Sequence, residues 1–277
     1  MTGAGDQVDW DALASVLFVP GSRPDRFGKA LASGAGLVCI DLEDAVPPDG
    51  KAAAREAAVA AIAPGLAIRM NPVTTREGLA DLLALAAAPR LPPVFVPKVE
   101  HEEQLVIVAG ALGASAQIVP LIEAPRGLRS AHRIAAHRRV AAMMFGGGDM
   151  AAELGVALAW EPLLHARSAF LAAAAEVGRP TIDVPWIALD DTAGLATEAA
   201  QARALGFTAK AAIHPAQVGA IEAAFRPMPE AIAEARAAEA AFAEAGGGVA
   251  RFNGKMLEAP VMRAYRRTLA RAGEADA

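Results

Sequence analysis

The stretch Met143-Met144-Phe145-Gly146-Gly147-Gly148-Asp149 is an apolar run that stops at a carboxylate, and Ile118-Val119-Pro120-Leu121-Ile122-Glu123 repeats this pattern. An apolar run of roughly four to eight residues is typical of a buried strand. In an α/β fold, a carboxylate at the C-terminal end of such a strand lies where ligands bind. Two such carboxylates on neighbouring strands suit Mg²⁺, which binds one or two carboxylates together with substrate oxygens and water. The two stretches therefore predict a metal-assisted enzyme that acts on an oxygen-rich small molecule.

Strand-like runs alternate with alanine-rich helical segments along most of the chain. The predicted strands cover residues 16–20, 37–42, 67–71, 94–98, 118–123, 142–145, 181–184 and 209–213. Helical periodicity is clearest over residues 51–62, 79–88 and 192–205, and Gly206 is a suitable C-cap for the last of these. Alternating strands and helices indicate a parallel sheet. Eight such units predict a closed (β/α)8 TIM barrel, with an open doubly wound sheet as the alternative.

The pattern changes after Pro215. We expect residues 1–225 to form the barrel and residues 226–277 a C-terminal helical extension, with helices over 230–245 and 259–271. The triple glycine at 246–248 makes the extension a candidate for a mobile or swapped lid that packs on a neighbouring subunit. The alternative, which we weigh equally, is that the extension is an arm that only packs against the rest of the protein and does not move as a lid.

Composition narrows the class of protein. The chain has 277 residues, a net charge of −5 and no strong basic cluster, which argues against a nucleic-acid partner. Its one cysteine, Cys39, excludes an internal disulfide and lies in an apolar run, as a core residue would. No apolar run reaches the roughly 20 residues of a membrane span, and residues 1–15 lack a secretory leader pattern. We expect a cytoplasmic protein without a membrane partner.

Polar groups follow nearly every predicted strand, whereas the strand bodies are apolar. These groups lie at residues 20–23, 41–44, 69–71, 97–98, Glu123, Asp149, Asp183 and 214–215. Because active sites of (β/α)8 barrels lie at the C-terminal ends of the strands, this distribution predicts an enzyme.

Glu123 and Asp149 are the predicted metal ligands. A surface ion pair, or for Asp149 an N-cap of a helix starting near Met150, is the structural alternative. The N–H groups of Gly147 and Gly148, beside Asp149, could bind a substrate carboxylate.

Arg69 is predicted to bind a carboxylate in bidentate fashion and to stabilise developing negative charge. An ion pair with Glu43 or Asp44 inside the barrel is the alternative, and both could hold together. Asp41 and Glu43 are expected on one face of their strand and Asp44 on the other, where they would orient Arg69 or a metal-bound water.

Lys98 and His214 also end predicted strands. Lys98 suggests a Schiff base, but a metal site favours a structural or charge-balancing role. For His214, a supporting hydrogen bond is favoured over general-base catalysis. The sequence has no Ser–His–Asp pattern, phosphate loop, zinc-type cysteine spacing or dinucleotide fingerprint.

The chain resembles the citrate lyase β-subunit-like group of the HpcH/HpaI aldolase superfamily. The motifs that carry this resemblance occur in the same order over nearly the whole chain. The matching residues are 17–22, 41–46, 69–71, 97–98, 122–123, 145–149, 154–155, 206–210, 213–215 and 217.

The resemblance implies a (β/α)8 barrel with a helical extension, assembled as a homotrimer or hexamer. It implies Mg²⁺ held by Glu123 and Asp149, and a charge-stabilising Arg69. It further implies cleavage of a 3-hydroxyacyl-CoA, such as citryl-CoA or malyl-CoA, to acetyl-CoA and a 2-oxo acid such as oxaloacetate. Ser22, Arg23 and Lys29 are the residues carried over as coenzyme A contacts.

One position departs from the family pattern. Relatives that act on CoA esters often carry an aspartate in the C-terminal extension that reaches a neighbouring subunit's site as acid/base, and Glu258 stands in its place. The extra methylene displaces the carboxyl group, and small displacements cost about a hundredfold in rate. Glu258 could keep the role, favour a shorter substrate or mark a changed reaction.

The main prediction is thus a Mg²⁺-dependent carbon–carbon lyase. Hydrolysis of a malyl-CoA-type thioester and aldol cleavage of a free 2-oxo acid are alternatives within enzymes. A catalytically weak subunit that binds a 2-oxo acid or acyl-CoA for a partner complex is the alternative from another class.

Overall fold

A computed structural model describes residues 8–273 of the chain. Two ranges lie outside the described residues, namely residues 1–7 and residues 274–277. The first belongs to the segment 1–15 in which no secretory leader pattern was found, and the second belongs to the predicted C-terminal extension. The chain divides between Ala224 and Phe225 into two compact units, which are described separately.

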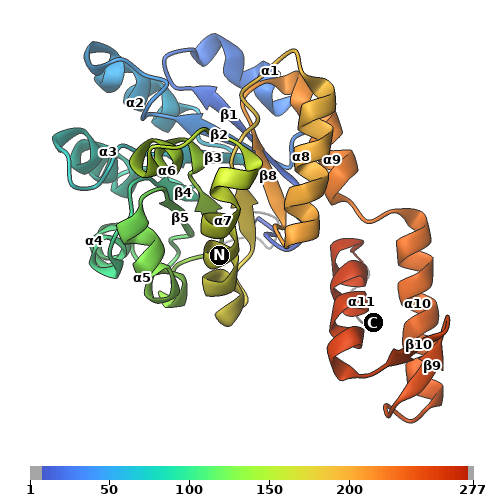
Figure 1. Cartoon of the computed structure of the whole chain (residues 1–277). Helices are drawn as coiled ribbons and strands as arrows, with labels where there is room; N and C mark the ends of the chain where they lie inside the picture. Colours follow the sequence, from blue (N-terminus) through green and yellow to red (C-terminus); the bar gives the residue numbers. More distant parts are fainter. Residues whose placement is uncertain (1–7, 274–277) are drawn as a thin grey trace. The chain divides into compact units, whose positions relative to one another are not determined.

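Eight parallel strands in sequence order form a closed barrel in the first unit, so the predicted (β/α)8 barrel is confirmed (Figure 1). The barrel closes where β1 pairs with β8 through Val16 and Ala211. The strands are β1 (Ser15–Pro20), β2 (Leu37–Asp41), β3 (Leu66–Arg69), β4 (Val94–Val96), β5 (Ile118–Ile122), β6 (Met143–Phe145), β7 (Thr181–Asp183) and β8 (Ala209–Ala212).

Helices follow the strands and surround the barrel (Figure 1). Two short 3-10 turns are η1 (Pro24–Arg26) and η2 (Pro48–Gly50), and the helices are α1 (Phe27–Leu31), α2 (Lys51–Ala60), α3 (Arg76–Ala86), α4 (Glu102–Leu112), α5 (Pro125–Ala136), α6 (Gly147–Leu154), α7 (Trp160–Glu176), α8 (Thr192–Leu205) and α9 (Pro215–Phe225). Local chemistry sets their ends. Asp191 caps α8 by accepting a hydrogen bond from the Gly194 N–H, and Gly206 ends that helix at a φ of 124°.

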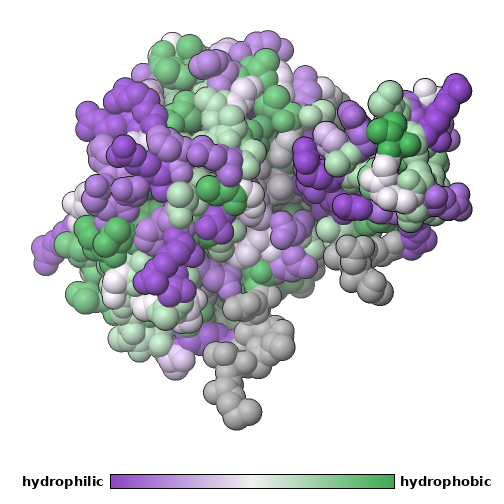
Figure 2. Space-filling model, turned by 90° about the horizontal axis from the view of Figure 1, so that it is seen from below, coloured by the Kyte–Doolittle hydropathy of each residue, from purple (hydrophilic) through white to green (hydrophobic). Residues whose placement is uncertain are grey.

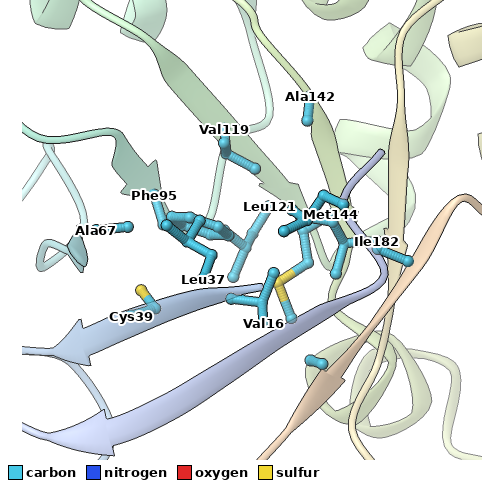
Figure 3. Close-up of a cluster of buried hydrophobic side chains, with 13 residues drawn as sticks. Val16, Leu37, Cys39, Ala67, Phe95, Val119, Leu121, Ala142, Met144 and Ile182 are labelled. Carbon is cyan, nitrogen blue, oxygen red and sulfur yellow. The ribbon is translucent and has the colours of Figure 1, made fainter. Parts of the chain in front are cut away.

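The barrel interior is filled by alternate residues of the strands. Figure 3 shows Val16, Leu37, Phe95, Leu121, Met144 and other side chains from different strands meeting there. Cys39, predicted to be a core residue, is among them and is fully buried. Because successive side chains of a strand point to opposite faces, residues two positions beyond these core residues also face inward. This rule fixes which strand-end side chains reach the mouth, by which we mean the C-terminal end of the barrel interior.

The second unit contains α10 (Pro229–Glu244), a hairpin of β9 (Ala250–Phe252) and β10 (Lys255–Leu257), and α11 (Ala259–Arg271). Its small core joins Ala238, Leu257 and Met262. The hairpin was not predicted. Its turn, Asn253-Gly254, has positive φ at both residues, which is the pairing that type I′ hairpins favour.

The described part of the chain contains no helix with the length and apolar character of a membrane span. On the face seen in Figure 2, hydrophilic residues are spread among hydrophobic ones.

Candidate active site

The mouth of the barrel holds a cavity of about 440 Å³. Inward-facing residues at the ends of six different strands line it, and these are Phe18, Asp41, Arg69, Glu123, Val184 and Ile213. Each lies two residues beyond an interior core residue, as strand alternation requires. The strand ends therefore build much of the cavity, and the turn after β2 and the start of α6 add Asp44 and Asp149.

Arg69 is fixed at the end of β3 by the acidic end of β2. Its Nε and Nη2 atoms donate to the two carboxylate oxygens of Asp41, both at 2.7 Å, and its guanidinium lies 5.4 Å from the centre of the Phe18 ring. Burial alone would lower the pKa of Arg69, but the hydrogen bonds and charges of Asp41 and its neighbours raise it. The bidentate partner of Arg69 is therefore Asp41, and its Nη1 atom faces the following turn.

That turn carries Glu43 and Asp44. Their carboxylates lie 2.9 and 3.4 Å from Nη1 of Arg69. Asp44 was expected on the opposite face from Glu43, but β2 ends at Asp41, so strand alternation does not extend to it. Lys51 at the start of α2 holds the turn by donating to the carbonyls of Leu42 and Glu43.

Glu123 follows β5 and is nearly buried. Its Oε1 accepts a 2.6 Å hydrogen bond from the backbone N–H of Lys98. Lys98 has a φ of 53°, a left-handed conformation that costs a non-glycine residue roughly 1 kcal/mol or more. Backbone strain at a functional site is often retained because it positions a group, and here it aims the N–H at Glu123.

Asp149 lies in the first turn of α6, whose N-cap is Gly146, so the alternative that Asp149 is an N-cap is wrong. Its carboxylate is about half exposed and lies 3.6 Å from Nζ of Lys98. Gly146 must be a glycine, because a Cβ there would lie 2.4 Å from Cβ of Glu123. The close approach brings the start of α6, with its free N–H groups, beside the Glu123 carboxylate.

Negative charge exceeds positive charge among these described residues. The cluster contains two cations, Arg69 and Lys98, and five carboxylates. The carboxylates are Asp41, Glu43, Asp44, Glu123 and Asp149. Burial, with repulsion from Glu43 and Asp149, raises the pKa of Glu123 to about 8. Burial likewise raises the pKa of Glu43 to about 7 against the pull of Arg69.

The residues fit a hard divalent cation. The buried Glu43 carboxylate is already paired, at 2.9 Å from Nη1 of Arg69 and 3.3 Å from Nζ of Lys98, whereas Glu123 and Asp149 line the same cavity and their like charges repel each other. Within the part of the chain that the structure describes, no cluster of three or more His, Cys, Asp or Glu forms a protein-only metal cage. Two carboxylates with open positions suit Mg²⁺, which keeps waters and takes substrate oxygens, better than Zn²⁺.

Lys98 balances charge in this cluster. Its Nζ lies 3.3 Å from Oε1 of Glu43 as well as near Asp149. Burial alone would lower the pKa of Lys98, but these carboxylates raise it. A Schiff-base lysine needs a lowered pKa to be nucleophilic, so the contacts favour the charge-balancing role.

Four predicted residues of the first unit, Ser22, Arg23, Lys29 and His214, are not among the residues that line this cavity. Ser22 and Lys29 are exposed, and the exposed Arg23 pairs with Asp25 at 2.8 Å. The Nδ1 atom of His214 accepts from the N–H of Ala216 at the start of α9. Glu258 is the N-cap residue of α11 in the second unit.

Asp183 ends β7 but points away from the cavity. With Arg167, Glu198 and Lys210 it forms a fully or nearly fully buried ion network between β7, β8 and helices α7 and α8. The Nζ of Lys210 also donates to the carbonyl of Val184 at 2.7 Å. Sequence reasoning missed this network, although a lysine inside the apolar run 209–213 signals a buried partner.

Sequence reasoning also missed a second group of buried polar contacts, which fixes the loop after Arg69. Asp81 of α3 accepts hydrogen bonds from the backbone and side chain of Asn71 and pairs with Arg55 of α2. It anchors the loop that follows Arg69 to two helices.

Comparisons with known proteins agree with the barrel fold. The chain belongs to the HpcH/HpaI aldolase/citrate lyase family, whose sequence profile matches residues 14–215. It is 35% identical over 268 residues to the citrate lyase subunit beta-like protein of Mycobacterium tuberculosis, covering 94% of this chain and 95% of the relative. It is 36% identical over 271 residues to the (3S)-malyl-CoA thioesterase of Cereibacter sphaeroides, covering 93% and 94%. It is also 32% identical over 283 residues to an L-malyl-CoA/beta-methylmalyl-CoA lyase of that organism, covering 87% and 89%.

Among solved structures, CitE from Mycobacterium tuberculosis in complex with magnesium, acetoacetate and coenzyme A is similar, with a TM-score of 0.82 and 35% identity. The match covers 96% of this chain and 100% of that one. The predicted resemblance to the citrate lyase β-subunit-like group is therefore confirmed.

Proposed function

We propose that this chain is a Mg²⁺-dependent carbon–carbon lyase that cleaves a 3-hydroxyacyl-CoA of the citryl-CoA or malyl-CoA type to acetyl-CoA and a 2-oxo acid. One observation carries the proposal: Glu123 and Asp149 line the same cavity as Arg69, which Asp41 holds in place. The 32% identity to a malyl-CoA lyase and the magnesium and coenzyme A in the CitE structure support it.

Glu123 and Asp149 would hold the cation. When bound, Mg²⁺ would act as a Lewis acid on the oxygen that becomes the ketone of the product. The backbone N–H of Lys98 orients Glu123 for this role, and Gly146 leaves room for it.

The chain's own residues would direct the bond changes. A base takes the proton of the 3-hydroxyl group, its O–H electron pair becomes the new C=O bond, and the C–C pair moves to the thioester enolate. Protonation of that enolate gives acetyl-CoA. Arg69 supplies fixed positive charge where negative charge develops, and because Asp41 already holds it, little reorganisation is needed.

Two further assignments belong to this proposal. Gly147 and Gly148, in the first turn of α6, offer N–H groups to the substrate carboxylate. Glu258 supplies the acid/base group, reaching the site from a neighbouring copy in a homo-oligomer. Ser22, Arg23 and Lys29 remain predictions as coenzyme A contacts.

A second candidate function is hydrolysis of a malyl-CoA-type thioester, which the 36% identity to (3S)-malyl-CoA thioesterases favours. The first half of the chemistry differs, since water attacks the thioester carbonyl and the C–C bond survives.

A mass-spectrometric assay of the full chain separates these functions. The protein is incubated with Mg²⁺ and acetyl-CoA plus glyoxylate, pyruvate or oxaloacetate, and in parallel with malyl-CoA or citryl-CoA. A C–C bond made or broken, and lost with EDTA, supports the lyase. Free CoA with the acyl carbon chain intact identifies the thioesterase instead, and no turnover with any pair rejects both.

A further inference from the structure

The mouth of the barrel has two chemically different arcs. In barrel order, the inward-facing strand-end residues on β2, β3 and β5 are Asp41, Arg69 and Glu123, with Asp149 following β6. On the other side of the ring, β7, β8 and β1 contribute Val184, Ile213 and Phe18. The residues of the first arc, Asp41, Arg69, Glu123 and Asp149, carry charged side chains, and we call them the charged arc, whereas the side chains of the second arc are apolar.

The charged residues of β7 and β8, Asp183 and Lys210, do not belong to this second arc. Ile182, Ala209 and Ala211 belong to the barrel interior, so Asp183 and Lys210 beside them point outward. Their partners confirm this direction, because Arg167 and Glu198 lie on the surrounding helices α7 and α8. Lys210 is fully buried among these partners, so it is not available to a ligand in the cavity.

Neighbouring side chains extend the hydrocarbon surface. Leu158, Pro185 and Ile187 line the same cavity, and we call these three, with Val184 and Ile213, the apolar arc. Ile187 and Ile213 are 61% and 42% exposed. A Cβ on Gly147 would lie 3.1 Å from Cγ1 of Val184, so α6 packs directly against the arc.

The cations of the cavity are already engaged on the opposite side. Arg69 is held by Asp41, Glu43 and Asp44, and Lys98 lies between Glu43 and Asp149. A 2-oxo acid whose carboxylate and oxo oxygens meet the charged arc must direct its remaining substituent toward the apolar arc. A second carboxylate in that substituent would lose water without gaining a charged partner.

Resting on the lyase function proposed above, we propose that this site selects monocarboxylic 2-oxo acids with a hydrogen or short alkyl substituent, and discriminates against dicarboxylic ones. The matching thioesters are of the malyl-CoA type or carry one extra alkyl group, not citryl-CoA. Ile213 and Ile187 determine this specificity. Each methylene that the apolar arc buries should strengthen binding about fourfold.

A matched pair of ligands tests the selectivity. 2-Oxobutyrate and oxaloacetate share a four-carbon chain and differ in a terminal methyl group against a terminal carboxylate. Titration calorimetry of the full chain with Mg²⁺ should give 2-oxobutyrate a Kd at least about tenfold lower than freshly prepared oxaloacetate. Omitting Mg²⁺ identifies binding outside the metal site.

Variants locate the selectivity in the apolar arc. Ile213→Lys and Ile187→Lys place an ammonium on exposed positions of the arc, so each should lower the Kd ratio in favour of oxaloacetate. Leu189→Lys is the control, because Leu189 is 51% exposed in the same connection after β7 but does not line the cavity. It should keep the ratio of the original protein.

The outcomes distinguish this inference from the function on which it rests. Mg²⁺-dependent binding of both acids with oxaloacetate equal or tighter overturns the selectivity and leaves the lyase proposal standing. An unchanged ratio in both arc variants overturns the assignment of Ile213 and Ile187. Absence of Mg²⁺-dependent binding by either acid, and by glyoxylate and pyruvate, overturns selectivity and lyase function together.

Discussion

Glu123 has a pKa of about 8 because it is buried beside Glu43 and Asp149. In the unfolded chain its pKa returns to about 4.5. Between these values the folded, metal-free protein binds more protons than the unfolded chain, so the stability contributed by Glu123 falls as pH rises through this interval. A cation that binds the ionised carboxylate must displace a proton below about pH 8 but not above it.

The stabilisation by Mg²⁺ should therefore increase with pH. Thermal unfolding with Mg²⁺ or EDTA should show a larger Tm gain at about pH 8.5 than at about pH 6. Glu123→Gln should abolish the gain at both, whereas Glu103→Gln, on the exposed side of α4, should keep it. An equal gain at both pH values would contradict the raised pKa of Glu123, and a Glu123→Gln protein that keeps the gain would remove Glu123 from the metal site.

Lys210 donates hydrogen bonds to both carboxylates of the buried ion network, Asp183 and Glu198. Lys210→Met keeps the volume but leaves a buried negative charge in excess, which should cost about 3–5 kcal/mol in the free energy of unfolding. Urea unfolding measures the loss. Asp183→Asn in the same chain should recover part of it, since the excess charge is then removed.

A matched surface pair provides the control. Arg23→Ala breaks the exposed pair with Asp25 and should leave the urea midpoint unchanged. A Lys210→Met protein as stable as the original would show that the network contributes specificity of packing and no net stability.

At the scale of elements, the turn from β6 to α6 positions the metal ligands. Gly146→Ala would drive a methyl group into Glu123, at 2.4 Å from its Cβ, whereas a Cβ on Gly148 meets nothing within 4 Å. We expect Gly146→Ala to weaken Mg²⁺ binding at least about tenfold and Gly148→Ala to change it little. Calorimetric Mg²⁺ titration compares the two variants, and equal affinities would show that this turn does not set the site.

The sequence predicted the strands well because each buried strand is a short apolar run between polar residues. Helix α8 agrees with its predicted bounds of 192–205, since Asp191 and Gly206 mark its ends chemically. The hairpin was missed because its only signal is Asn253-Gly254 between three-residue strands. Short elements carry too few residues for periodicity to show.

Within the site, the sequence located the charged residues but not the direction in which they point. Asp183 and Glu123 both end apolar runs, yet Asp183 faces α7 whereas Glu123 lines the cavity. Direction depends on where each strand ends, and a shift of one residue reverses it. The apolar arc could not be predicted from the sequence for a related reason. In the sequence, Val184 and Ile213 cannot be distinguished from other apolar strand residues.

At the scale of the whole molecule, the proposed acid/base Glu258 belongs to a different unit from the cavity residues. Glu258→Gln should lower kcat at least about a hundredfold while leaving the Mg²⁺-dependent Kd of the 2-oxo acid unchanged. Unchanged turnover would remove Glu258 from the mechanism. Glu244→Gln, at the end of α10 in the same unit, is the control and should retain full activity.

Mixing variants tests whether the carboxyl group comes from another copy. Arg69→Ala and Glu258→Gln proteins, each inactive alone, should regain part of the activity after co-expression if Glu258 serves a neighbouring copy's site. Activity that stays absent in a verified mixed oligomer would place both residues in one chain's site or exclude Glu258.

The pairing of β1 with β8 has a consequence for how this protein is made. Val16 pairs with Ala211 and Leu17 pairs with Ala212. Strand β1 is synthesised before the other strands of the barrel, so one of its edges stays unpaired until β8 has been synthesised. Until then the nascent chain exposes apolar strands with open edges, which invite aggregation. Long-range parallel pairing also folds slowly. Slower synthesis at lower temperature, or added chaperones, should therefore raise the yield of soluble protein.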